Sequence, residues 1–291
     1  MRKIGGEAKT PSDIASRFVG TSAQNGFGFV HKCNPICNHK FVEIMSGTSR
    51  LAVTAANSGI PSESYEILRN PNENIFHSNN SKSIFSRVAS GLISILWIGI
   101  TCSSWTRARR GKGGNGFPGP LRDNDKYIWG LPGLCPKDHE KVLLGNKQVR
   151  WVAKLIAHAI RHKVPLILEN PLTSRLWLVP EIKKLVDSGT VSEFYHCAYG
   201  AEWAKPTRLA CWNINLASLA QRCSCKNGIC DFTDQPHLIL SGIGSHSCFK
   251  TAEASAYPWK FCRKFVEKTF FDQKTALFWK SRPFKRPSIG V

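Results

Sequence analysis

Two short stretches place reactive side chains where a fold could bring them to a ligand. Cys102 lies in a loop of small residues just after an apolar run at 92–98. Glu169 and Asn170 follow a second apolar run at 164–168. Each run is typical of a buried parallel strand, and open α/β sheets bind ligands at the carboxyl ends of such strands. A thiol, a carboxyl group and an amide are groups that can attack, protonate and orient a substrate. For Asn170, capping of a following helix is an alternative role.

A strand, a small-residue turn and a helix near the start of the chain form a unit that could hold a nucleotide-like ligand. The strand is expected at 41–45 and the helix at 51–56. The backbone can approach a ligand closely at Gly47, and Glu66 lies about 20 positions further on, where nucleotide-binding folds place a ribose-binding carboxylate. An ordinary crossover with a surface Glu66 is the alternative. The candidate cofactor-binding residues are Met45, Ser46, Gly47, Thr48, Ser49 and Glu66.

A third group of residues could bind a metal ion. Cys223, Cys225, Cys230 and His237 lie close together in a loop that also contains glycine and proline. Three thiolates and an imidazole would complete a tetrahedral zinc site, although the spacing differs from the common pairs with two intervening residues. Unliganded loop cysteines are the alternative interpretation.

The elements that must position these residues alternate between strands and helices. Further strands are expected at 191–196 and 208–212, and helices at 84–91 and 145–162. This alternation predicts an α/β fold with a doubly wound, mostly parallel sheet. The predicted organisation is a flexible arm at 1–39, one domain at 40–270 with a small cysteine-rich insertion at about 222–247, and a basic tail at 271–291.

The charge of the chain indicates a polyanionic partner. Forty Lys and Arg face twenty Asp and Glu, which leaves a net charge of +20 over 291 residues. Nucleic acid fits better than an anionic membrane, because no basic amphipathic helix is evident. A basic, glycine-rich stretch after Cys102 could close over a phosphate backbone or form a solvated loop. The cations expected near the reactive cysteine are Arg107, Arg109, Arg110, Lys205 and Arg208.

Cysteine usage and hydropathy bear on location. Eleven cysteines, an odd number, without an apolar leader at 1–10, favour a reduced intracellular protein. The longest apolar stretch, 91–102, is well short of the roughly 20 residues that span a bilayer. The expected location is therefore intracellular, nuclear in a eukaryote and cytoplasmic otherwise, with no membrane partner.

The order of these motifs resembles that of the DNA cytosine-5 methyltransferases, in particular divergent phage and mobile-element relatives. The strand and turn at 41–49 resemble the segment that binds S-adenosylmethionine, and the loop at 101–105 resembles the one that carries the nucleophile. The Glu-Asn pair at 169–170 and a closing segment at 251–258 also match, and the resemblance spans about 41–265.

The resemblance implies a Rossmann-like fold that binds S-adenosylmethionine and transfers its methyl group to cytosine carbon 5. Cys102, Glu169 and Asn170 would be the catalytic residues, and Glu66 would hold the cofactor ribose. DNA is favoured over RNA as the substrate. Thr101 stands where the family has proline, so a catalytically impaired nucleic-acid-binding protein is an alternative function. A zinc-thiol module in which Cys102 is merely buried is a third.

Overall fold

One mixed sheet of six strands forms the centre of an α/β fold. The computed structural model describes residues 39–111, 118–242 and 250–272. The strands run in the order β2-β1-β3-β4-β6-β5. Their bounds are β1 (Lys40–Ile44), β2 (Ser62–Tyr65), β3 (Ile93–Gly99), β4 (Leu166–Pro171), β5 (Thr190–Tyr195) and β6 (Pro206–Trp212). Strands β2, β1, β3 and β4 are parallel, as expected, whereas β6 runs antiparallel to both β4 and β5.

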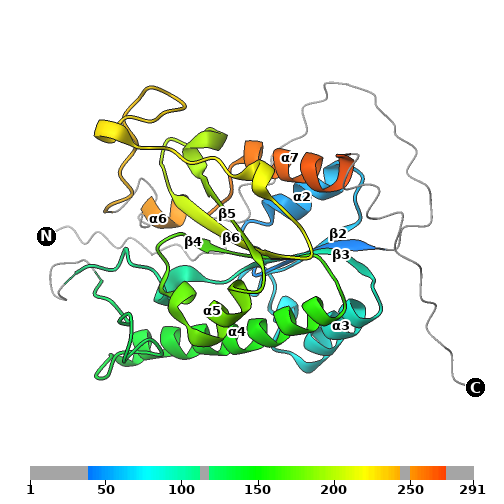
Figure 1. Cartoon of the computed structure of the whole chain (residues 1–291). Coiled ribbons are helices and arrows are strands. Elements are labelled where there is room, and N and C mark those ends of the chain that lie inside the picture. The colour runs from blue at the N-terminus through cyan, green and yellow to red at the C-terminus, as the bar shows by residue number, and fades with distance from the viewer. Residues whose placement is uncertain (1–38, 112–117, 243–249, 273–291) are drawn as a thin grey trace, which may run out of the picture.

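Helices cover both faces of this sheet (Figure 1). Their bounds are α2 (Arg50–Asn57), α3 (Ser78–Ala89), α4 (Pro136–Arg161), α5 (Pro180–Val186), α6 (Lys250–Glu253) and α7 (Trp259–Val266). Helices α3, α4 and α5 lie on one face, and α2 and α7 lie on the other. None of the helices in the described ranges is long and apolar enough to cross a membrane.

The alternation of side chains along the strands divides the core into two layers. Val42 and Leu96 face α3 and α4, whereas Phe41 and Trp97 face α2 and α7. Phe261 of α7 packs against Trp97 at 6.1 Å between ring centroids. Burial of each such side chain stabilises the fold by about 1.5–3 kcal/mol. The strands whose carboxyl ends carry the reactive residues are therefore packed on both faces.

Two helices begin earlier than the sequence pattern predicts. Helix α4 begins at Pro136 rather than near residue 145, because a proline at the first helical position and Asp138 in the first turn favour that start. Helix α3 begins at Ser78, within a stretch of Asn and Ser that was expected to be a polar loop. Only Ile84 and Val88 of α3 are buried, so the stretch before Ile84 carries no apolar period.

Four elements were not anticipated, namely β2, α5, α6 and α7. Strand β2 has the polar sequence SESY, and its pairing with β1 rather than its own pattern makes it a strand. The expected arm at 1–39 and the basic tail at 271–291 lie almost wholly outside the described residues, as do the glycine-rich residues 112–117 and the insertion from 243 onward.

Candidate active site and metal centre

The carboxyl ends of β3 and β4 bring two of the predicted reactive residues to one edge of the sheet. Gly99 of β3 pairs with Glu169 of β4 in the parallel register. Cys102 follows Gly99 by three positions and opens a short 3-10 turn at Cys102–Ser104. Cys102 is exposed and Glu169 is buried. Cys102 and Glu169 thus lie at the carboxyl ends of neighbouring strands, where the sequence predicted both of them.

Lys205 is the positive charge that acts on both groups. Desolvation by the surrounding protein raises the pKa of the Cys102 thiol, Lys205 opposes this shift, and Glu169 adds to it. Burial also raises the pKa of the Glu169 carboxyl, against the effects of Lys205 and of a hydrogen bond. Burial lowers the pKa of the Lys205 ammonium, whereas Glu169 and Cys102 oppose that change. The thiol and the carboxyl group are held toward their protonated forms, and Lys205 favours their ionisation.

The position of Lys205 differs from the role predicted for it. Its Nζ donates to the carbonyl oxygens of Ala254 at 2.8 Å and Ser255 at 3.3 Å, in the segment before α7. Its backbone has a φ of +29°, which L residues rarely adopt and which the surrounding contacts must maintain. Lys205 was predicted to contact nucleic acid, but its ammonium group is bound within the site.

Tyr257 holds the Glu169 carboxyl group by a hydrogen bond. Its hydroxyl donates to Glu169 Oε2 at 2.9 Å and accepts from Trp97 Nε1 at 3.1 Å. A Cβ atom at Gly99 would lie 3.2 Å from both the Tyr257 hydroxyl and the Met45 carbonyl oxygen. Glycine at position 99 therefore lets the ends of β1, β3 and β4 meet around Glu169.

Asn170 holds the loop that carries Cys102. Its Nδ2 donates to the carbonyl oxygen of Ile100 at 2.7 Å, and its side chain is fully buried. Gln148 of α4 donates to the Thr101 hydroxyl at 3.2 Å. The Asn170 Oδ1 is buried and has no hydrogen-bond partner in the part of the chain that the structure describes. Asn170 was predicted to be catalytic, and the contacts present make it a positioning residue with one open acceptor.

Arg122 fastens the turn after Cys102 to α4. Its guanidinium lies 3.4 Å from the centre of the Trp105 ring and donates to the backbone and hydroxyl oxygens of Ser104 at 3.2 and 3.0 Å. Burial lowers the pKa of Arg122 to about 9, which leaves it charged at neutral pH. A Cβ atom at Gly145 would lie only 2.5 Å from the Ser104 hydroxyl, so α4 approaches this turn too closely for any larger residue.

The turn after β1 is closed by Glu66. Glu66 Oε2 accepts from the Gly47 amide at 2.8 Å, and Oε1 accepts from the Leu68 amide at 3.1 Å. A carboxylate accepts at about four sites, so about two remain for a ligand. Met45, Gly47 and Ser49 have positive φ angles, and Ser46 and Ser49 share a hydrogen bond of 2.9 Å between their hydroxyls. The remaining residue of the predicted cofactor-binding group, Thr48, is exposed.

A second buried carboxyl group, Glu43, lies on β1 behind this turn. Its Oε2 accepts from the Ala52 amide at 2.8 Å, in the first turn of α2. The helix amide at Ala52 is thus bound to the protein rather than open to a ligand. Burial raises the pKa of Glu43 to about 8, although the bond from Ala52 and the charge of Arg69 oppose the shift. Glu43 is protonated at neutral pH and serves the packing of α2 on the sheet.

The predicted arginines divide into two groups. Arg109 is paired with Asp138 at 3.1 Å, and Arg208 is paired with Glu193 at 2.7 Å. Arg107 and Arg110 are exposed, and Arg110 donates to the Arg107 carbonyl at 3.2 Å. Exposed guanidinium groups can meet phosphate directly, whereas the paired ones would first have to leave a carboxylate.

A cluster of three thiols and one imidazole forms a candidate metal centre. Its members are Cys197, Cys223, Cys230 and His237, whose ligand atoms all lie within 4.8 Å of one another. Cys223 Sγ lies 3.8 Å from His237 Nε2. Zinc–ligand distances of about 2.0–2.3 Å give a tetrahedron with edges of about 3.5–3.8 Å. The cluster can therefore hold a metal ion after small movements.

The fourth ligand differs from the one that the sequence predicted. Cys225 lies outside the cluster, and its thiol donates to the Cys223 carbonyl at 3.8 Å. Cys197 takes its place from the short helix His196–Tyr199 that follows β5. Cys225 was predicted as a ligand because it is near Cys223 in the sequence. In the structure its φ of 50° places it in a turn, outside the cluster.

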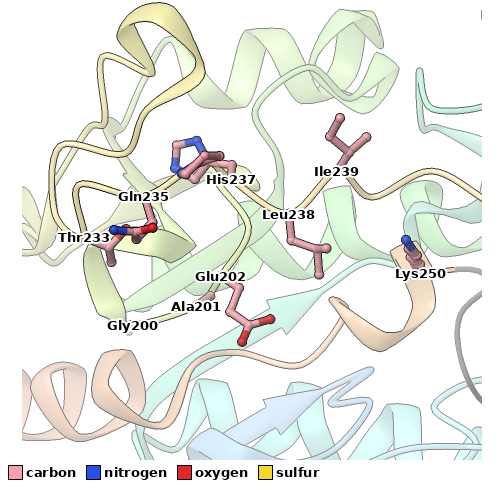
Figure 2. A pocket seen from close by; sticks show the side chains of 10 residues that line it. Gly200, Ala201, Glu202, Thr233, Gln235, His237, Leu238, Ile239 and Lys250 are labelled. Carbon is pink, nitrogen blue, oxygen red and sulfur yellow. The ribbon is translucent and has the colours of Figure 1, made fainter.

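An open pocket of about 690 Å³ adjoins this cluster. Figure 2 shows side chains of the insertion, including Gln235 and His237, on the same pocket as Glu202 and Lys250. Leu238 also lines this pocket, and its amide donates to the Glu202 carbonyl at 2.8 Å. The pocket thus opens between the insertion and the loop that leads to Lys205.

Sequence reasoning missed three residues of the site. Arg122 and Gln148 carried no motif, and Cys197 stood alone in a strand-like stretch. Tyr257 was part of the recognised closing segment, but its contact with Glu169 spans 88 positions and has no local signature.

The sequence matches no protein-family model and no curated protein.

Proposed function

We propose that the protein transfers a methyl group from S-adenosylmethionine to carbon 5 of cytosine in nucleic acid, DNA more readily than RNA. The observation that carries this proposal is the meeting of Cys102, Glu169 and Lys205 at the ends of adjacent strands. A nucleophile, an acid and a cation at one ligand-binding edge are the groups that the reaction needs.

The order of the strands supports a Rossmann-like, doubly wound interpretation of the fold. The chain passes from β1 to β2 on one side and then to β3 on the other side of β1. In open α/β sheets such a change of direction creates a ligand crevice outside the carboxyl ends of the two strands. An antiparallel strand near one edge is common in sheets of this class.

The carboxyl ends of β1 and β3 offer suitable groups for the cofactor. The half-buried Glu66 carboxylate retains acceptor capacity for ribose hydroxyls, and the Met45 carbonyl faces the same space as the Tyr257 hydroxyl. S-adenosylmethionine bound there supplies an electrophilic methyl group. Cys102 and Glu169 stand at the neighbouring strand ends, where the base would enter.

The residues of the chain have distinct tasks in this reaction. The Cys102 thiol gives its proton to solvent, and the thiolate adds to carbon 6 of the base, which makes carbon 5 nucleophilic. Glu169, protonated because burial raises its pKa, donates to N3 as negative charge builds on the base. Lys205 stabilises the thiolate. Once carbon 5 carries the methyl group, a water molecule takes the proton from carbon 5 and the carbon–sulfur bond breaks, which restores the thiolate. N3 then returns its proton to Glu169.

The surroundings of the site support a nucleic-acid substrate. The net charge of +20 and the exposed Arg107 and Arg110 provide contacts for phosphate. The target base must leave the helix stack to reach Cys102, which costs a few kcal/mol in a duplex and less in a single strand.

Zinc is the metal that we propose for the cysteine cluster. Three thiolates and one imidazole are the ligand set of structural zinc sites, whereas magnesium and calcium bind oxygen. The cluster is buried and uses all four tetrahedral positions, so it leaves no open position for a substrate.

A covalent trap tests the catalytic proposal. The full chain is mixed with S-adenosylmethionine and an oligonucleotide that contains 5-fluorocytosine, whose fluorine cannot leave as a proton does. We expect a denaturation-resistant adduct in which mass spectrometry finds the base on Cys102, and at least about 10³-fold less adduct with Cys102→Ser. Binding of both ligands without any adduct would favour the impaired, nucleic-acid-binding alternative, to which the raised pKa of the Cys102 thiol also points.

A further inference from the structure

The cysteine cluster joins two segments that lie far apart in the sequence. Cys197 follows β5, whereas the other three ligands belong to the insertion at 223–237. Cys197, Cys223 and Cys230 are almost completely buried, and they form a small core of their own that is separate from the two layers around the sheet. A core of three cysteine side chains is too small to hold a segment by apolar burial alone, so this region needs the metal.

The segment that the cluster holds is the loop that ends in Lys205. The amide of His196, the neighbour of Cys197, donates to the Ala204 carbonyl at 2.8 Å. The amide of Leu238, the neighbour of His237, donates to the Glu202 carbonyl at 2.8 Å. Residues adjacent to two of the four ligands therefore fix this loop on both sides of residue 203.

Lys205 depends on such support. Its φ of +29° is unfavourable for a lysine, and its Nζ must reach the Ala254 carbonyl in a different part of the chain. We infer that a zinc ion bound by Cys197, Cys223, Cys230 and His237 acts as a clamp that keeps Lys205 close to Cys102 and Glu169. On binding, each of the three thiols releases its proton to solvent, and no redox step is involved.

This inference deepens the proposed function but is tested without methyl transfer. The primary measurement is the metal content of the purified full chain, for which we expect about one zinc ion per chain. Cobalt(II) substitution should give the visible and charge-transfer bands of a tetrahedral thiolate site. Cys197→Ser should lower zinc affinity at least tenfold, whereas Cys225→Ser, the matched control, should retain it. Loss of the metal from Cys225→Ser with retention in Cys197→Ser would overturn the assignment, as would an iron–sulfur chromophore.

The link to Lys205 has its own readout. Alkylation of Cys102, followed by mass spectrometry of its peptide across a pH series, reports how readily this thiol ionises. We expect Cys197→Ser, and wild-type protein stripped of zinc, to require a higher pH for the same rate, because Lys205 no longer favours the thiolate. Zinc added back to the stripped protein should restore the profile, which keeps the test valid if Cys197→Ser does not fold.

Two outcomes separate this clamp from a purely structural metal and from the catalytic proposal. Lys205→Met should shift the Cys102 profile while zinc stays bound. An unchanged Cys102 profile after complete and reversible zinc removal would refute the clamp, even if the protein loses thermal stability. If the protein forms no 5-fluorocytosine adduct but shows the expected zinc content and alkylation profiles, the catalytic proposal fails and the clamp stands.

Discussion

The carboxyl end of the sheet and the cysteine cluster both gather reactive side chains, but different forces hold them. Cys102 and Glu169 stand on strands whose flanks are filled by aromatic and aliphatic residues. The cluster stands in turns with several left-handed residues, and cysteines are almost its only buried side chains. The first region is organised by the core before any ligand arrives, whereas we propose that the second becomes rigid when an ion binds.

This difference also determines how each region handles charge. At the sheet, buried polar groups such as Glu43 and Arg122 are desolvated and bound to neutral partners, so their pKa values shift toward the neutral forms. At the cluster, binding of the proposed metal would couple to ionisation of the thiols. Mutations should therefore affect stability and pH dependence at the sheet, and metal content at the cluster.

The largest effect on stability is expected from Arg122→Met. The change leaves buried acceptors, among them the Ser104 and Val142 carbonyls, without their donor. We expect a loss of about 3–5 kcal/mol in the free energy of unfolding, measured by urea denaturation, with unchanged zinc content. Arg150→Met, at an exposed arginine on α4, is the control and should cost less than about 1 kcal/mol. Equal effects of the two variants would show that Arg122 does not hold the turn.

An intermediate effect is expected from Glu43→Gln, and it depends on pH. The pKa of Glu43 in the folded chain, about 8, lies above its ordinary value of 4.5. The protonated group therefore stabilises the fold fully below pH 4.5, and this contribution is lost as the pH rises through 8.

Between pH 5 and pH 9 the wild type should lose on the order of 3 kcal/mol that Glu43→Gln retains. Thermal unfolding of both proteins across this range measures the difference. Parallel pH curves for the two proteins would mean that Glu43 is not desolvated as described.

The smallest effect is expected from Tyr257→Phe. The variant removes the hydroxyl that donates to Glu169 and accepts from Trp97, which should cost about 1–2 kcal/mol. Because this hydrogen bond lowers the pKa of Glu169, its loss should raise that pKa further. The alkaline limb of adduct formation should then move to higher pH. A profile that moves to lower pH, or not at all, would contradict the assigned contact.

Parts of the fold and of the site could be predicted because their signals are local. The apolar run of β3 and the Glu-Asn pair at the end of β4 are read within a few residues, and each lies where it was expected. Strand β2 and helix α7 could not be predicted in the same way. Their patterns are short, and partners from distant parts of the chain determine their conformation.

The sequence by itself determined which residue types are available, namely an exposed-loop cysteine, a strand-end glutamate and a set of closely spaced cysteines. Only the tertiary structure decided that Lys205 faces Cys102 and Glu169, that Tyr257 holds Glu169, and that Cys197 replaces Cys225. The physical reason is that hydrogen bonds, charge and ligand geometry act over a few ångströms in space. Folding brings residues within that range regardless of how far apart they lie along the chain.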